Sequence, residues 1–295
     1  MHVAEARTSV IVPAFRAWAT LPSVLDALRP QIEGHDRQAI VVESSGGVSA
    51  DELESRWPWA RFLVLGEQTL PGRARNLGAG ASRGELLAFI DADAIPAPDW
   101  LDALEGALVS DVDAVAGSVV NGTPGSGVGT AGYLLEFADW LPSGNHELLH
   151  AVTCNLVVRR ATFEELGGFH EDVFPGEDTI FTFPLAGSGR LAFAPTARVR
   201  HLNRTGLREF LRHQRRLGAA YAQVCARVDF PHRWTGRPAL APLGVPFRLA
   251  ALGRQLHGHR SEALQALRLL PLLALGLVAW SSGLAGGSKL SPNSS

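Results

Sequence analysis

The chain has 295 residues, of which 46% are hydrophobic, and its 27 basic and 29 acidic side chains give a formal net charge of −2. This length and apolar content suit one large α/β domain, or such a domain with an appendage. Cys154 and Cys225 lie far apart and form no CxxC or Cys/His cluster, which argues against a disulfide framework and a zinc site. The segment MHVAEARTSVIVPAF lacks the long apolar region of a secretory signal, so we expect a cytosolic domain with reduced thiols.

The charges are divided unevenly along the chain. Residues 201–295 hold 13 basic and 3 acidic side chains, so the totals of 27 and 29 leave 14 basic and 26 acidic side chains for the first 200 residues. A basic tail favours a phosphate-bearing partner, such as nucleic acid, a nucleotide or an anionic membrane. Because the tail is rich in Leu, Pro and Trp and lacks Lys-rich runs, we expect a membrane surface and no nucleic acid.

Strands and helices are predicted to alternate through the first 120 residues. The expected strands are 8–13, 39–42, 60–65, 85–90 and 113–120, and the expected helices are 21–28, 71–84 and 99–108. This alternation predicts a Rossmann-like, mostly parallel central sheet flanked by helices. Ligands of such sheets bind beyond the carboxyl ends of the strands, so we expect the chemistry directly after Pro13, Val42, Leu65 and Ile90.

The second half of the chain is predicted to become helical towards its end. A glycine-dense loop at 122–132 is followed by expected strands at 151–159 and 191–194 and expected helices at 162–168, 177–186 and 206–228. Pro-rich segments and an apolar run, 269–280, come last. We therefore expect a main domain over 1–228 and a Pro-rich, basic and apolar helical tail over 229–295.

Two aspartates, Asp91 and Asp93, follow the apolar strand 85–90. Alternate strand residues point the same way, so the two carboxylates can share one face. Two like charges held close would raise a pKa unless a cation lies between them, and Mg²⁺ or Mn²⁺ with a diphosphate fits that need. The alternative is a solvated turn that caps the helix near Pro98. The spacing alone leaves both open, and the position at the ligand edge favours the metal.

Four other motifs could carry chemistry, and each has a purely structural alternative. Glu177 and Asp178 follow a Pro-Gly turn, where a carboxylate could act as a general base or only complement a helix dipole. Arg73 and Arg75 could contact phosphates, or lie in solvent. The basic face that contains Arg215 could clamp a diphosphate or lipid phosphates, or be merely solvated. The candidates for metal or phosphate contact also include His201, in VRHLNR, although a lone histidine is more often structural.

Taken in order, these segments resemble the family 2 glycosyltransferases of the GT-A fold. The resemblance runs from about Ser9 to about Tyr221. It is carried by SVIVPAF, VVESSGG, GRARNLGAGASRGELLAFIDADAIPAPDWL, CNLVVRRATFEELGGFHEDVFPGEDTIF and PTARVRH. Each segment alone would be weak, whereas the ordered set is specific. The resemblance makes 1–228 the expected catalytic domain.

The resemblance implies a role for each matching residue. Glu43 takes the place of the usual aspartate that contacts the base, which puts the base preference in doubt. Asp178 matches the expected catalytic base, with Glu177 beside it. The candidate metal ligands are Asp93 and Asp91, which match the DxD motif, and His201, which is a candidate from its own segment and not from the resemblance. The candidate nucleotide-sugar ligands are Pro13, Ala14, Glu43, Arg73, Arg75, Asn76, Asp91 and Arg215.

The implied reaction is metal-dependent, inverting transfer of a single sugar from a UDP-, GDP- or dTDP-sugar to a hydroxyl acceptor. The cofactor would be Mn²⁺ or Mg²⁺, and a lipid-linked acceptor is one option. The segment HQRRLG lacks the tryptophan of processive synthases, which argues for single transfer. The alternatives are a sugar-nucleotide nucleotidyltransferase, disfavoured by the glycine-free loop PAFRAW, and a non-catalytic nucleotide-sugar binder at the membrane.

The apolar run 269–280 is too short to span a bilayer alone. Three alternatives stay open: a marginal transmembrane helix, an interfacial helix, or a segment packed on the catalytic domain. Basic residues before the run and Trp280 near its end favour membrane association. We therefore expect the protein at the cytoplasmic face of the cell membrane, either peripheral or with a single C-terminal span.

Overall fold

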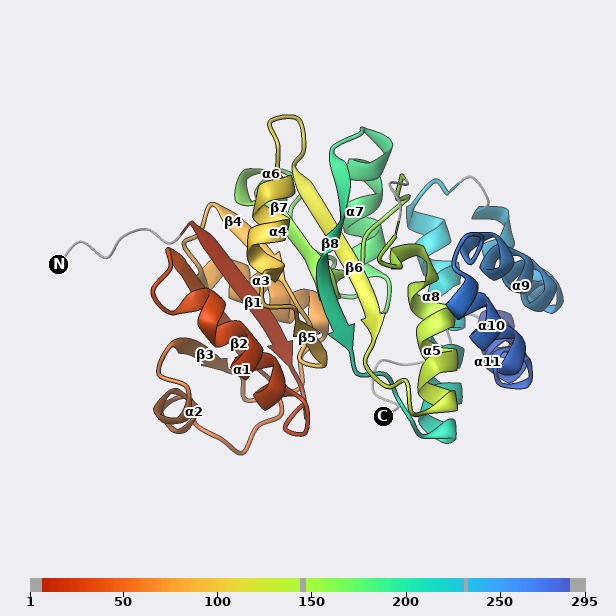
Figure 1. Ribbon diagram of the computed structural model, residues 1–295, viewed down its shortest axis with the longest axis horizontal. Helices are drawn as coiled ribbons and strands as arrows, with labels where there is room; N and C mark the ends of the chain where they lie inside the picture. Colours follow the sequence, from red (N-terminus) through yellow and green to blue (C-terminus); the bar gives the residue numbers. More distant parts are fainter. Residues whose placement is uncertain (1–6, 144–146, 231–232, 287–295) are drawn as a thin grey trace. The chain divides into compact units, whose positions relative to one another are not determined.

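The computed structural model describes residues 7–143, 147–230 and 233–286 (Figure 1). The chain forms two compact units, one of residues 1–120 and 142–201 and the other of residues 121–141 and 202–295. This division differs from the boundary expected at residue 228, because helix α8 (Leu207–Arg227) packs against the C-terminal helix α11 (Leu270–Gly286) in the second unit.

The first unit is built on an eight-stranded sheet with the order β3-β2-β1-β4-β7-β6-β8-β5. Strands β3, β2, β1 and β4 pair in parallel, whereas β7 pairs antiparallel with β4 and β6, and β5 pairs antiparallel with β8. The expected α/β architecture is therefore confirmed, with an antiparallel half added to the parallel one. The strands are β1 (Thr8–Ala14), β2 (Arg37–Glu43), β3 (Ala60–Val64), β4 (Leu86–Phe89), β5 (Ala94–Pro96), β6 (Ala114–Asn121), β7 (Leu156–Arg159) and β8 (Leu191–His201).

Helices cover the sheet, which explains why β1, β2 and β4 are buried along most of their length rather than at alternate residues. Helix α3 packs on β1 and β2, α1 on β2 and β5, and α4 on β7 and β8. Gly78 of α3 permits a close approach, since a Cβ there would lie 2.6 Å from Ile11 Cγ2. The helices of this unit are α1 (Leu21–Ile32), α2 (Ala50–Arg56), α3 (Pro71–Ala81), α4 (Trp100–Ala107), α6 (Arg160–Glu165) and α7 (Glu177–Gly187), with the 3₁₀ turn η2 (Thr153–Asn155).

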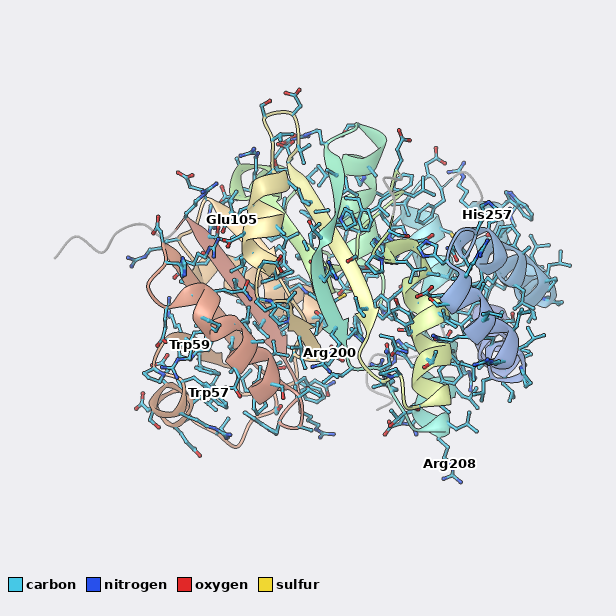
Figure 2. All side chains as sticks on the ribbon, in the orientation of Figure 1. Trp57, Trp59, Glu105, Arg200, Arg208 and His257 are labelled. Atoms are coloured by element: carbon cyan, nitrogen blue, oxygen red, sulfur yellow. The ribbon has the colours of Figure 1, made fainter. Side chains whose placement is uncertain are left out.

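Strand β8 is longer than the expected 191–194 and ends at His201. Its second half alternates, because Ala197, Val199 and His201 are buried while Arg198 and Arg200 are exposed (Arg200 is labelled in Figure 2). The longer strand places the imidazole of His201 at its carboxyl end.

A buried amide holds β8 in place. Asn155 is fully buried, and its Nδ2 donates to the carbonyl oxygens of Ser118 and Ala197, each at 2.8 Å. Its Oδ1 accepts from Trp100 Nε1 at 2.8 Å. One satisfied polar side chain thus joins β6, β8 and α4, which favours a single arrangement of these elements.

The second unit is helical. Its core is the contact between α8 and α11, which is close enough that a Cβ on Gly218 would collide with the carbonyl oxygen of Trp280. Trp280 is 4% exposed and packs against the ring of Tyr221, so it is not the interfacial anchor that the sequence suggested. The other elements are α5 (Gly127–Phe137), η1 (Ala138–Trp140), η3 (Arg233–Gly236), η4 (Pro238–Leu243), α9 (Gly244–Gln255) and α10 (Arg260–Arg268).

Within the described ranges, no single helix is long and apolar enough to cross a membrane. Helices α10 and α11 reach the required length and composition only as a pair, and the pair is bent by 79°.

Candidate active site

The carboxyl ends of β1 and β2 lie side by side, as the parallel arrangement requires. Ala14 and Glu43 are paired in the register, and Ser44 N donates to the carbonyl oxygen of Ala14 at 2.9 Å. Glu43 is fully buried, and its Oε1 accepts from Ser45 N at 2.5 Å. Its Oε2 has no hydrogen-bond partner within the described part of the chain. A buried carboxylate oxygen without a donor is costly, so this edge is suited to a ligand that brings an N–H group.

Asp91 and Asp93 lie in a turn rather than on a strand. Strand β4 ends at Phe89, and Ala94 N donates to the carbonyl oxygen of Asp91 at 3.0 Å. The argument from strand alternation was therefore wrong for these residues, and their side chains take different partners. Asp91 Oδ1 accepts from Arg75 Nη2 at 2.7 Å, whereas Asp93 Oδ1 lies 3.5 Å from His201 Nε2.

The pairing of β5 with β8 brings Asp93 to His201, because Ala94 is the register partner of His201. The His201 side chain is 7% exposed and that of Asp93 is 35% exposed. Carboxylate oxygen and imidazole nitrogen are both ligands of divalent cations. The described residues contain no group of three or more His, Cys, Asp or Glu side chains arranged to hold a metal ion. Two protein ligands still fit Mg²⁺ or Mn²⁺, which commonly complete their shell with water and substrate phosphates.

Arg75 is the buried centre of the site. Its side chain is 3% exposed, Nη1 donates to Glu177 Oε1 at 2.6 Å, and Nη2 donates to Asp91 Oδ1 at 2.7 Å. Burial lowers the pKa of Arg75, but the carboxylates of Asp91 and Glu177 outweigh burial and raise the pKa above its ordinary value. The guanidinium is therefore charged at every accessible pH, and it joins α3, the Asp91 turn and the start of α7.

Glu177 and Asp178 begin α7 directly after Gly176, whose φ of 112° is accessible to glycine. Glu177 is 3% exposed, and burial raises its pKa to about 7, with Asp178 adding to the rise and Arg75 opposing it. Asp178 is only half-buried, and its Oδ1 accepts from Thr179 N at 2.7 Å. The two acids thus differ: Glu177 is a buried partner of Arg75, and Asp178 is the one that solvent reaches.

The thiol of Cys154 is buried near these acids. Cys154 is 3% exposed, and burial, together with the charges of Asp91, Asp93 and Asp178, raises the pKa of its thiol well above the ordinary value. The expected free thiol is confirmed, and it is buried and neutral.

Residues 9–167 match the model of the glycosyl transferase family 2. The chain belongs to this family. It is similar to glycosyltransferase AglE of Haloferax volcanii, with 27% identity over 223 residues that cover 73% of each chain. The expected enzyme class, a glycosyltransferase, is confirmed, which sets aside the nucleotidyltransferase and the non-catalytic binder.

Two solved structures resemble the glycosyltransferase in fold. The mannosyltransferase PcManGT from Pyrobaculum calidifontis, in complex with GDP-Man and Mn²⁺, has a TM-score of 0.61 at 20% identity, over 93% of this chain and 85% of that one. Glucosyl-3-phosphoglycerate synthase from Mycobacterium tuberculosis, in complex with Mn²⁺, UDP-glucose and phosphoglyceric acid, has a TM-score of 0.52 at 22% identity, over 75% and 79%. The GT-A fold expected from the resemblance is confirmed.

Other predicted ligands of the glycosyltransferase have different surroundings from those expected. Asn76 is bound to a loop, since its Nδ2 donates to the carbonyl oxygen of Phe169 and its Oδ1 accepts from Phe169 N, both at 2.9 Å. Gly72 lies against the carbonyl oxygen of His170, so a neighbouring loop covers the backbone at this position. Arg73 is exposed on α3, and Arg215 is exposed on α8 in the second unit. Their roles, like those of Pro13 and Ala14, stay predictions.

Two further residues of the site were missed from the sequence. Phe169 lies under Arg75, with its ring centroid 5.7 Å from the guanidinium carbon, and it belongs to an aromatic cluster with Phe89. Arg16 has a φ of 51°, alone among the described residues other than glycine in having a positive φ. Its N–H donates to Ser45 Oγ at 2.5 Å, which joins the loops after β1 and β2. A positive φ is strained for a residue with a side chain, and nothing in PAFRAW signals it.

Proposed function

We propose that the glycosyltransferase transfers a single sugar, with inversion, from a nucleoside diphosphate sugar to a hydroxyl acceptor, and that the reaction depends on a divalent metal ion. The observation that carries this proposal is the network at the carboxyl edge of the sheet, in which Asp93 meets His201 and Asp91 shares Arg75 with Glu177. A solvated turn would not require a buried arginine behind one aspartate and a buried imidazole beside the other.

The charge of this network supports a cation. Asp91, Asp93 and Asp178 contribute three carboxylates, and Arg75, which also contacts Glu177, is the buried cation among them. The excess negative charge favours a divalent ion. Asp93 and His201 would hold Mn²⁺ or Mg²⁺, with Asp91 at its side. When bound, such an ion stabilises the negative charge that develops on a departing diphosphate.

Glu43 supports the assignment of the nucleoside end. The Oε2 atom needs an N–H donor, and uracil, thymine and guanine each have a ring N–H. Pro13 and Ala14 end the adjacent strand and would border the same nucleoside. The donor class therefore comprises UDP-, dTDP- and GDP-sugars.

Asp178 is the proposed general base. Its half-buried carboxylate takes the proton of the acceptor hydroxyl, the acceptor oxygen forms a bond to the anomeric carbon, and the bond from that carbon to the diphosphate breaks with its electrons leaving on the diphosphate. In-line attack inverts the anomeric centre. Glu177 cannot replace Asp178, because it is 3% exposed and bound to Arg75.

A donor panel tests the proposal. Calorimetry measures the binding of UDP-, GDP- and dTDP-sugars to the full chain in Mn²⁺, in Mg²⁺ and in EDTA. The panel starts with UDP-glucose and GDP-mannose, because these are named for the two similar structures. We expect one donor to bind only with metal and to release its nucleoside diphosphate when a soluble or a lipid-linked alcohol is added. Equal binding in EDTA and in Mn²⁺ would contradict the metal, and release of pyrophosphate would contradict sugar transfer.

A further inference from the structure

The outward face of helix α10 has an inverted pattern of side chains. The helix packs on α5 and α11, yet none of its residues is buried. Leu264 and Leu267 are 56% and 70% exposed, whereas the smaller Ala263 and Ala266 are half-buried. A helix on the surface of a protein in water normally turns its large apolar side chains inward. The inversion therefore points to a partner on the outer side.

Helix α11 is apolar on both its inner and its outer side. Leu273 and Leu277 are 1% and 0% exposed in the core of the second unit, whereas Leu275 and Val278 are 48% and 57% exposed. A helix that is apolar all round belongs in a core or in lipid. We call the exposed large apolar side chains of the two helices the α10–α11 apolar surface, which comprises Leu264, Leu267, Leu270, Leu275 and Val278.

The charges around this surface are basic. Arg260 and Arg268 are exposed and lie four residues on either side of Leu264, so they share its face of the helix. His257, labelled in Figure 2, is exposed in the turn between α9 and α10. Helix α10 carries one acid, Glu262, beside Arg260 and Arg268, and Arg254 is exposed in the last turn of α9. Two copies of the chain would bring like charges together here, whereas anionic lipid headgroups complement them.

We propose that the α10–α11 apolar surface binds in the plane of an anionic lipid bilayer, with the leucines among the acyl chains and the arginines at the headgroups. The geometry favours lying on the membrane over spanning it. The inner side of α11 is buried in the second unit at Leu273 and Leu277, which leaves its outer side to meet lipid. The inner side of α11 packs against α8. Helix α8 itself carries two exposed basic side chains, Arg212 and Arg215. This surface is independent of the sugar-transfer chemistry, and it would keep the enzyme at the cytoplasmic face, where anionic lipids are concentrated.

Vesicle flotation of the full chain tests the proposal without detergent. We expect the protein to float with phosphatidylcholine vesicles that contain phosphatidylglycerol, and less with phosphatidylcholine alone. Leu264→Asn with Leu267→Asn should weaken binding on the order of tenfold. Val109→Asn, in the first unit and 58% exposed, is the matched control and should change nothing. Arg260→Gln with Arg268→Gln should abolish the preference for phosphatidylglycerol.

Environment-sensitive labels separate the possible partners. Both native cysteines are buried, so the dye NBD would react at an introduced Leu267→Cys or Val278→Cys and, as the control, at Val109→Cys. We expect a blue shift with anionic vesicles at the first two positions only. The proposal fails if no label responds to vesicles. It also fails if the shift appears without vesicles and follows protein concentration, because the partner would then be a second copy of the chain.

Discussion

Arg75 Nη1 lies 2.6 Å from Glu177 Oε1, and both side chains are 3% exposed. The pair joins α3 to the first turn of α7 across 102 residues of sequence. The same guanidinium also binds Asp91. One buried cation therefore binds one acid of the Asp91–Asp93 motif and one acid of the Glu177–Asp178 motif. The other acid of each motif has a different partner, since Asp93 lies near His201 and Asp178 accepts from Thr179 N.

Removing the cation should destabilise the enzyme. We predict that Arg75→Met lowers the free energy of unfolding in urea by about 3 kcal/mol, because two carboxylates lose a buried partner. Arg75→Lys should restore little activity, since one ammonium cannot serve both carboxylates as the forked guanidinium does. Arg73→Met, exposed on the same helix, is the control and should stay within about 0.5 kcal/mol of wild type. Equal stability of the two methionine variants would refute the role of Arg75.

The stability of the enzyme should depend on the titration of Glu177. Its pKa is raised from 4.5 to about 7, so the native state binds a proton in this range that the unfolded chain has released. The stability that this proton contributes is present below pH 4.5 and is lost as the pH rises through 7. Glu177→Gln should lack this loss in urea unfolding at pH 5 and pH 8, whereas Glu67→Gln, exposed in a loop, should keep it. The same pH slope in wild type and Glu177→Gln would show that Glu177 is ionised throughout.

Glu43 should lower the stability of the free enzyme and strengthen the binding of the donor. Its buried Oε2 has no partner among the described residues. We therefore predict that, in the absence of donor, the free energy of unfolding of Glu43→Gln is about 1 kcal/mol higher than that of wild type. The same variant should bind the nucleoside diphosphate roughly tenfold more weakly, because a charged acceptor of the base N–H is lost. Calorimetric titration and urea unfolding measure the two effects. A variant that binds the nucleotide as tightly as wild type would remove Glu43 from the nucleoside site.

The imidazole beside Asp93 should matter for the metal. We predict that His201→Ala raises the Mn²⁺ concentration needed for half-maximal donor binding by roughly tenfold to a hundredfold. His35→Ala, exposed after α1, serves as the control. If both variants need the same Mn²⁺ concentration as wild type, His201 is a structural residue of β8.

The parts of the fold that the sequence predicted are those that depend on local pattern. The apolar run before Asp91 predicted a strand that ends at the ligand edge, and the order of the motifs predicted the family. The partners of Arg75 were beyond such reasoning, because nothing local in a chain specifies a contact across 102 residues. His201 was only a weak candidate until the register of β5 with β8 placed it beside Asp93.

The tail shows a second limit of sequence reasoning. An apolar run has the same composition whether it is a core or a membrane surface, so Trp280 was interpreted as an interfacial anchor although it is buried against Tyr221. The inverted face of α10 becomes visible only when its packing shows which side of the helix is covered.

The central claim is that Asp178 is the base and takes no part in donor binding. The most direct measurement compares Asp178→Asn with wild type, by calorimetric donor binding in Mn²⁺ and by product formation in the same samples. We predict that donor affinity changes less than about threefold, while turnover falls by roughly 10² to 10⁴-fold. Turnover close to that of wild type, with the donor still bound, would contradict the account.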